Sequence, residues 1–162
     1  MISEAQQKSI ESDLSKFYGE QIFLTGHTVR GGGSINDAYE LKTNHGKFFV
    51  KLNSSSQYPD MFNREAEGLN ALIGPNVIDV PAPLAVGEAE GSAYLILEYI
   101  ENGKPGNNFW GQFAHSLSNL HRVNNEKFGF DTDNYIGSLT QSNKWHADWT
   151  NFFIQERLEP LV

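Results

Sequence analysis

Apolar residues recur at helical spacing in four segments of the chain, and each segment is long enough for an amphipathic helix. The predicted helices cover residues 3–18, 60–73, 110–120 and 148–158. The first carries Ile10, Leu14 and Phe17 on one face. The second has Asp60 as a candidate N-cap and stops at Gly74-Pro75. The third carries an apolar stripe made of Trp110, Phe113, Leu117 and Leu120.

Shorter segments between these helices have the alternation and the aromatic and β-branched content of strands. Strands are predicted over residues 21–30, 35–42, 47–53, 84–86 and 93–100. A stretch rich in Gly, Pro and Asn follows at residues 101–108, and residues 124–145 are polar and turn-rich. The pattern therefore predicts a five-stranded sheet with one inserted helix, then a linker, then the beginning of a helical region.

Composition and charge exclude several classes of protein. A chain of 162 residues is about one domain, and its 39% apolar and 12% aromatic content is enough for a core. Cysteine is absent, which excludes disulfides, cysteine-ligated zinc and a thiol nucleophile. The net charge of −8 argues against a general nucleic-acid or anionic-membrane binder. No signal peptide or membrane span is visible, so we expect a cytoplasmic protein.

Three consecutive glycines, Gly31-Gly32-Gly33, separate the first two predicted strands. Glycines allow backbone N–H groups to approach a ligand closely, and such concavities bind phosphate. No Gly-Lys-Ser/Thr follows, so this is not the loop of P-loop NTPases. A glycine loop within a hairpin is typical of protein kinases, and the alternative is a flexible hairpin turn.

The third predicted strand contains a lysine among apolar residues. Its alternation places Phe49 and Lys51 on one face, with Phe48, Val50 and Leu52 on the other. A lysine inside so apolar a sheet needs a partner or a ligand, unless the strand is an edge strand and the lysine reaches water.

The second predicted helix offers that partner. Glu65 lies beside the apolar stripe and can face the sheet, whereas Glu67 points nearly opposite. The alternative for Glu65 is a boundary residue that pairs with solvent or with Arg64 of a neighbour. A glycine hairpin, a strand lysine and a helix glutamate in this order are typical of the pair that positions ATP phosphates in kinases.

The last predicted strand ends in Glu98, Tyr99 and Ile100, immediately before the linker. In a kinase-like domain this junction binds adenine through one carbonyl and one N–H group, and Glu98 and Ile100 have the required alternate spacing. The alternative is an ordinary strand exit.

Together these residues resemble the fructosamine/ketosamine-3-kinase family, relatives of the aminoglycoside phosphotransferases. The motifs that carry the resemblance are Gly32–Asn36, Phe49–Asn53, Met61–Leu69, Val80–Pro83, Leu97–Tyr99, Leu120–Arg122, Phe128–Phe130, Asp133–Ser138, Trp145, Asp148-Trp149, Phe152-Phe153 and Arg157-Leu158. It implies an α+β fold: a protein-kinase-like N-lobe over residues 1–100, with a five-stranded antiparallel sheet and one helix. A hinge over 101–108 and an incomplete helical C-lobe over 109–162 follow.

The resemblance also implies an activity and assigns site residues. The activity is ATP- and Mg²⁺-dependent phosphorylation of the 3-hydroxyl of a ketosamine, which is a glycated amine or protein. The residues that cover the phosphates would be Gly31, Gly32, Gly33, Ser34, Ile35 and Asn36. Lys51 would hold the α- and β-phosphates, Glu65 would orient Lys51, and residues 98–100 would bind adenine.

Two departures from the family pattern limit this expectation. Many members carry a cysteine where this chain has Ser34, so a thiol switch is not expected. No His-Gly-Asp or Asp-Phe-Gly-like run is present, so the general base and the metal ligands are expected beyond Val162. The segment alone should then be inactive. The alternative is a non-catalytic nucleotide-binding or scaffolding module complete at 162 residues.

The aromatic residues near the C-terminal end have two interpretations. Trp145 and Trp149, with Phe152 and Phe153, could form a wall for the sugar–amine adduct or the core of the helical region. Asp148 is a further candidate for the substrate amine. His121 falls in the middle of the apolar stripe of the third helix and is interpreted as a core histidine, neither a base nor a metal ligand.

Overall fold

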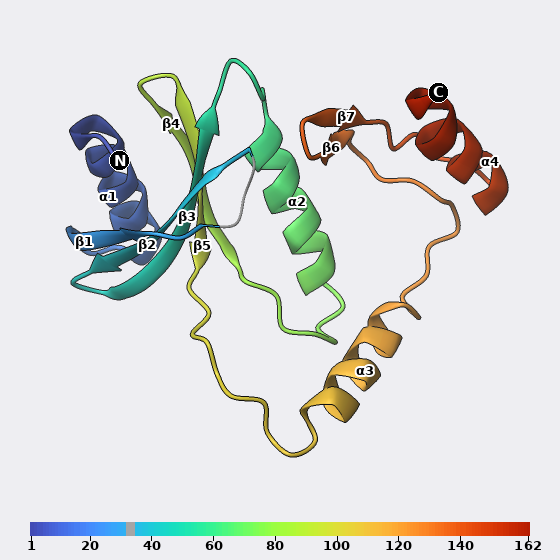
Figure 1. Cartoon of the computed structure of the whole chain (residues 1–162), viewed down its shortest axis with the longest axis horizontal. Coiled ribbons are helices and arrows are strands. Elements are labelled where there is room, and N and C mark those ends of the chain that lie inside the picture. Colours follow the sequence, from blue (N-terminus) through green and yellow to red (C-terminus); the bar gives the residue numbers. More distant parts are fainter. Residues whose placement is uncertain (32–34) are drawn as a thin grey trace.

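Five strands form one antiparallel sheet in the computed structural model, which describes residues 1–31 and 35–162 (Figure 1). The strand order is β1-β2-β3-β5-β4. The strands are β1 (Leu24–Val29), β2 (Asp37–Thr43), β3 (Gly46–Ser54), β4 (Pro83–Ala89) and β5 (Ser92–Glu98). The helices are α1 (Glu4–Tyr18), α2 (Met61–Ile73), α3 (Phe109–Leu120) and α4 (Trp149–Phe153). The predicted α+β fold with a five-stranded antiparallel sheet is confirmed.

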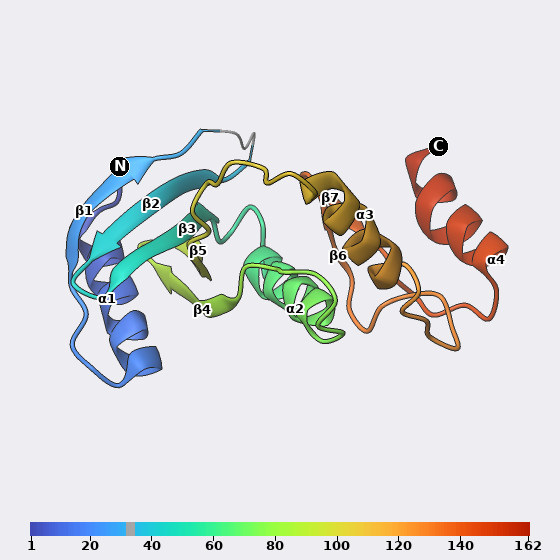
Figure 2. The ribbon, with the colours of Figure 1, turned by 90° about the horizontal axis from the view of Figure 1, so that it is seen from below.

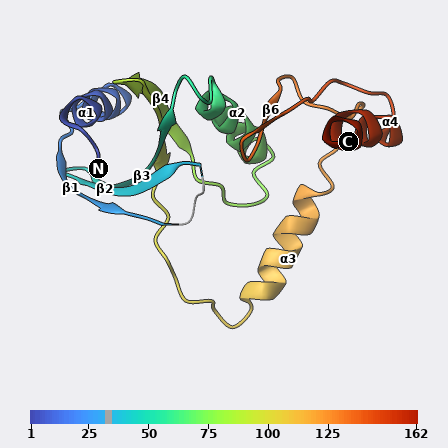
Figure 3. The same cartoon turned by 45° about the horizontal axis from the view of Figure 1, so that its top comes forward.

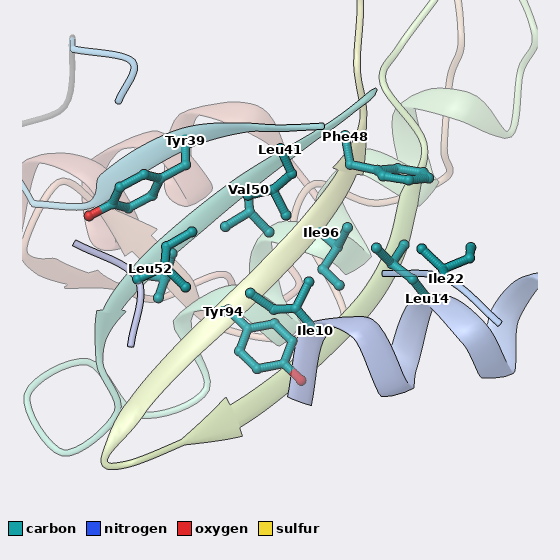
Figure 4. Packing of buried hydrophobic residues seen from close by; sticks show 11 residues of the cluster. Ile10, Leu14, Ile22, Tyr39, Leu41, Phe48, Val50, Leu52, Tyr94 and Ile96 are labelled. Atoms are coloured by element: carbon teal, nitrogen blue, oxygen red, sulfur yellow. The ribbon is translucent and has the colours of Figure 1, made fainter. Parts of the chain in front are cut away.

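Helix α1 covers one face of the sheet and closes the main core (Figure 4). Ser3 and Gln6 form a capping box at its start: the Gln6 N–H donates to the Ser3 hydroxyl at 3.2 Å, and the Ser3 N–H donates to Gln6 Oε1 at 2.9 Å. Ile10 and Leu14 are fully buried, as the stripe predicts. Phe17 does not join them: it lies in the last turn, is 54% exposed and contacts the ring of Tyr18 edge-on.

Helix α2 covers the opposite face, where it packs against β4 and β5 and is approached by the Phe49 and Lys51 side chains of β3. Phe62 of the helix and Leu95 and Leu97 of β5 form a small second core. The helix begins and ends as predicted, but Asp60 does not cap it in the expected way. Asp60 has a left-handed backbone (φ 59°), and its side chain accepts from the Asn63 amide and not from a backbone N–H group. The fold thus separates two sheet faces, and only the α2 face carries the polar residues discussed below.

Helix α3 follows an extended segment and lies away from the sheet (Figure 1). It forms where predicted, yet none of its residues is buried within the part of the chain that the structure describes. Trp110 is 72% exposed and Phe113 is 43% exposed. His121 lies just past the helix and is exposed, so its interpretation as a core histidine is wrong.

The segment after α3 contains a small hairpin that the sequence pattern did not predict. Strands β6 (Asn134–Ile136) and β7 (Leu139–Gln141) pair antiparallel within the stretch interpreted only as polar and turn-rich. Helix α4 continues into a wider π-helical turn at Ile154–Leu158 and a 3₁₀ turn at Glu159–Leu161. Over residues 1–31 and 35–162, every helix is too short or too polar to span a membrane.

Candidate functional site

Lys51 lies in the central strand of the sheet. In register, it stands opposite Ala38 of β2 on one side and Leu95 of β5 on the other. The alternative of a lysine on an edge strand is therefore wrong. The alternation of β3 directs Phe48, Val50 and Leu52 into the α1 core, so Lys51 and Phe49 face α2.

The Glu65 carboxylate receives the Lys51 ammonium. The distances from Lys51 Nζ to Glu65 Oε1 and to Oε2 are both 2.7 Å. The two side chains are 23% and 29% exposed, so the pair is partly shielded from water. Arg64 does not compete for Glu65, because its guanidinium binds Glu67 at 3.0 and 3.1 Å. The predicted contact between strand lysine and helix glutamate is present.

A cavity of about 430 Å³ opens beside this ion pair. Its walls come from the residues just before β2, from β3, from α2 and from the β6–β7 hairpin. The lining residues are Ile35, Asn36, Lys51, Met61, Arg64, Glu65, Gly68, Leu69, Leu72, Asn134, Tyr135 and Gly137. Of the predicted phosphate loop, Ile35 and Asn36 line the cavity and Gly31 is exposed after β1. Gly32, Gly33 and Ser34 lie outside the described residues.

A second pocket of about 330 Å³ lies where β5 leaves the sheet. Its apolar walls are Phe49, Pro81, Leu97 and Ile100, and its polar lining comes from Arg30, Glu98, Tyr99 and Asn102. Phe49 and Lys51 are alternate residues on one face of β3, and alternate residues lie about 6.6–6.8 Å apart. The two cavities are therefore neighbours along one strand, the first charged and the second mainly apolar.

Part of the backbone at residues 98–100 already forms a hydrogen bond within the sheet region. The Glu98 N–H donates to the carbonyl of Ala82 at 2.9 Å. The predicted adenine contacts use the Glu98 carbonyl and the Ile100 N–H, so this bond does not conflict with them. The Tyr99 ring turns towards β2, where its hydroxyl donates to Glu40 Oε2 at 3.0 Å. Residues 98–100 all line the second pocket, and their contact with adenine stays a prediction.

Glu40 is a buried carboxylate that the sequence reasoning missed. Its residue is 3% exposed, and its partners are the Arg30 guanidinium, the Tyr99 hydroxyl and, at 3.8 Å, Lys47 Nζ. The Arg30 hydrogen bond lowers the pKa of Glu40 although burial raises it, and the Tyr99 hydrogen bond adds to the lowering. Through its hydrogen bond with Tyr99, Glu40 connects the residues that follow β5 to strand β2. The burial of Glu40 follows from its position opposite Phe49 in the sheet. That register is not visible in the sequence, so no signal in the sequence marks Glu40 as buried.

The candidate substrate residues near the C-terminal end lie elsewhere. Trp145 and Trp149 are 39% and 54% exposed, so they do not form a buried core, and of the four aromatics only Phe152 is buried. The Asp148 carboxylate caps α4: it accepts from the Asn151 N–H at 2.9 Å and from the Asn151 amide at 2.6 Å. Neither Trp145, Asp148 nor Trp149 lines the two cavities above. Their contact with a substrate stays a prediction.

Metal-binding side chains are not clustered in the part of the chain that the structure describes. No group of three His, Asp or Glu residues there is placed to hold a metal ion. The described side chains therefore do not fit a Mg²⁺ site by themselves, and the position of the metal ligands stays a prediction.

An antiparallel five-stranded sheet whose central lysine is held by a helix glutamate is the arrangement of the kinase-like phosphotransferases. A sequence profile of the fructosamine kinase family matches residues 6–162, and the chain belongs to this family.

Three relatives illustrate the match. The chain is 36% identical over 157 residues to a probable ketoamine kinase of Synechocystis sp., covering 96% of this chain and 53% of that protein. It is 39% identical over 143 residues to the chloroplastic protein-ribulosamine 3-kinase of Oryza sativa subsp. indica, covering 86% and 41%. The crystal structure of a protein assigned as a fructosamine-3-kinase from Haemophilus somnus superposes with a TM-score of 0.85 at 30% identity, covering 93% and 51%. The chain thus spans about half the length of these relatives.

Proposed function

We propose that this chain carries the ATP-binding half of a kinase that phosphorylates the 3-hydroxyl of ketosamines, the adducts that sugars form with amines or proteins. The observation that carries the proposal is the Lys51–Glu65 pair in the wall of a cavity, in a chain of the fructosamine kinase family. The names of the Synechocystis and rice relatives, a ketoamine kinase and a ribulosamine kinase, support the substrate class. A cytoplasmic location is part of the proposal.

The pocket at the end of β5 fits an adenine base. Phe49, Pro81, Leu97 and Ile100 present apolar surface to a flat heteroaromatic ring, and such pockets gain affinity from burial while a few polar groups fix orientation. The exposed backbone from Glu98 to Ile100 would supply those polar groups. ATP, when bound, supplies the phosphoryl group that is transferred.

The neighbouring cavity fits the phosphates. An ammonium group has three N–H donors, and two of those of Lys51 are directed at the Glu65 oxygens. The third remains for an α- or β-phosphate oxygen, and Glu65 holds the ammonium in place for it. Gly31–Asn36 would cover the phosphates from the other side. The general base and the Mg²⁺ ligands would lie outside residues 1–162, because the sequence contains no His-Gly-Asp run.

The test uses the polypeptide as its gene encodes it, with ATP and a 1-amino-1-deoxyfructose adduct of a simple amine. ADP release gives the rate, and ³¹P and ¹³C NMR of the product identify the phosphorylated hydroxyl. We expect Lys51→Ala to lower kcat/KM by more than about tenfold, or 1.4 kcal/mol on the barrier, with folding nearly intact. Lys8→Ala is the matched control, because Lys8 forms an exposed pair with Glu4 on α1.

Three results would each contradict a part of the proposal. Activity of Lys51→Ala within about tenfold of the wild type would remove Lys51 from the phosphate site. Failure of the wild-type protein to phosphorylate any ketosamine, with ATP binding intact, would favour the non-catalytic module. Turnover by residues 1–162 alone would show that the general base lies within them.

A further inference from the structure

The β6–β7 hairpin lies against α2 on the side away from the sheet, so that α2 is held between the two (Figures 1 and 2). The view in Figure 3 shows the same order of layers, with β6 beside the helix. The two elements are more than sixty residues apart in the sequence. Their contact is therefore a tertiary feature with a specific set of bonds.

Two hydrogen bonds join the hairpin region to α2 and to the loop that leads into it. The Tyr135 hydroxyl donates to the carbonyl of Pro59 at 3.0 Å, two residues before the helix begins. The Thr132 hydroxyl donates to Glu67 Oε2 at 2.6 Å, in the second turn. The Tyr135 ring also meets the Tyr58 ring edge-on, with centroids 6.4 Å apart. The contacts thus fix both the start and the middle of α2.

Helix α2 is held on the sheet side mainly by its first turn, with Ala66 and Leu69 partly buried against the second core. Only Met61 and Phe62, both in the first turn, are buried. A 13-residue helix is marginal by itself, so its position depends on what it packs against. Glu65 lies one turn beyond the buried pair, between the residues that the hairpin contacts. A shift of α2 would therefore move the Glu65 carboxylate relative to Lys51, which is fixed in the central strand.

The hairpin also forms part of the site itself. Asn134, Tyr135 and Gly137 line the same cavity as Lys51 and Glu65. Gly137 lies at the hairpin turn with φ +62°, and a side chain there would come within 3.7 Å of Ile35. The hairpin therefore reaches from α2 to the start of β2.

We propose that the hairpin braces α2, and that Tyr135 is a positioning residue for the Lys51–Glu65 pair. The inference rests on the proposed function, since it treats that pair as the phosphate-binding element. Tyr135 acts through Pro59 and the helix start, and it needs no contact with the nucleotide. Loss of the Tyr135 hydroxyl should make α2 more mobile. It should weaken nucleotide binding only through the resulting displacement of Glu65 from Lys51.

The test compares Tyr135→Phe with Tyr58→Phe in the polypeptide as its gene encodes it. Both changes remove one hydroxyl from the same aromatic pair, but the Tyr58 hydroxyl bonds to no residue that the structure describes. The probe is a non-hydrolysable ATP analogue, titrated calorimetrically against each variant, alone and combined with Glu65→Gln. Hydrogen–deuterium exchange of the α2 amides is measured without nucleotide, and Thr132→Val tests the second bond.

We expect Tyr135→Phe to weaken analogue binding about threefold to tenfold and to speed exchange in α2, with Tyr58→Phe unchanged. In the Glu65→Gln background the additional loss should be less than about twofold, because the pair that transmits the effect is gone. Thr132→Val should act in the same direction as Tyr135→Phe.

Three results would overturn the inference. The first is equal binding by Tyr135→Phe and Tyr58→Phe. The second is an equal loss with and without Glu65, which would show that Tyr135 acts through the general structure or through direct contact with the nucleotide and not through Glu65. The third is unchanged exchange in α2. The proposed function would still hold in each case if the wild-type protein binds the analogue and the Lys51→Ala variant does not. A wild type that binds no analogue would refute the proposed function, and the positioning role with it.

Discussion

Replacement of Glu65 by glutamine isolates the contribution of the ion pair. The substitution keeps the shape of the side chain and removes the charge that both bonds to Lys51 use. A hydrogen bond to a charged group contributes about 1.5–3 kcal/mol, and partial exposure of these side chains, 23% and 29%, places the pair near about 1–2 kcal/mol. If all of that free energy serves to position Lys51 for a phosphate, the affinity of Glu65→Gln for an ATP analogue is about 5- to 30-fold lower than that of the wild type.

The assay is calorimetric titration of the analogue, with urea unfolding as the parallel measure of stability. Glu4→Gln is the control, because Glu4 binds Lys8 at 2.6 Å in an i, i+4 pair whose side chains are 83% and 71% exposed. Water screens so exposed a pair and leaves it little effect, and it lies on α1, which lines neither of the two site cavities. Affinity of Glu65→Gln within about twofold of the wild type, or an equal loss in Glu4→Gln, would refute the assignment of Glu65.

Two further predictions concern stability. The pKa of Glu40 is lowered in the folded protein, chiefly by the hydrogen bond from Arg30. The ionised Glu40 therefore contributes to the free energy of unfolding above the unfolded carboxyl pKa of about 4.3, and this contribution is lost as the pH falls through the pKa of Glu40 in the folded protein. Glu40→Gln should therefore flatten the fall in unfolding free energy below about pH 5, measured in urea; an unchanged pH profile would contradict this. Gly68→Ala should stabilise the protein by about 0.5–1 kcal/mol and raise Tm by about 1–4 °C in a thermal scan, since its added Cβ meets no atom within 4 Å; a lower Tm would show that the helix cannot accept a side chain there.

Local periodicity was sufficient to predict most of the elements around the site. The alternation in β3 assigned opposite faces to Lys51 and Val50, and helical spacing turned Glu65 and not Glu67 towards the sheet. Both assignments depend on geometry that each element carries within itself, with periods of 2 and 3.6 residues. For this reason the sequence could predict that Lys51 and Glu65 face one another, while the strand order was needed to exclude an edge lysine that reaches water.

Contacts that depend on register and on docking were outside the reach of the sequence. Glu40 is buried because β2 places it opposite Phe49 and beside Arg30 and Tyr99, and no local pattern marks a carboxylate for burial. The β6–β7 hairpin has only three residues in each strand, too few for alternation to be recognised. Phe17 was misplaced because the apolar stripe of α1 extends beyond the part that the sheet covers. His121 was misplaced because an apolar stripe predicts a buried face, and α3 buries none of its residues in the described part of the chain.

The sequence by itself determined the secondary structure of the sheet region, the faces of its strands and the order of glycine loop, lysine and glutamate along the chain. Each of these follows from local residue types and their spacing. Only the tertiary structure decided that β3 is central, that two cavities adjoin along it, and that the β6–β7 hairpin contacts α2 on the side away from the sheet. These features join residues far apart in the chain, and their free energy comes from packing and hydrogen bonds that exist only once the elements have docked.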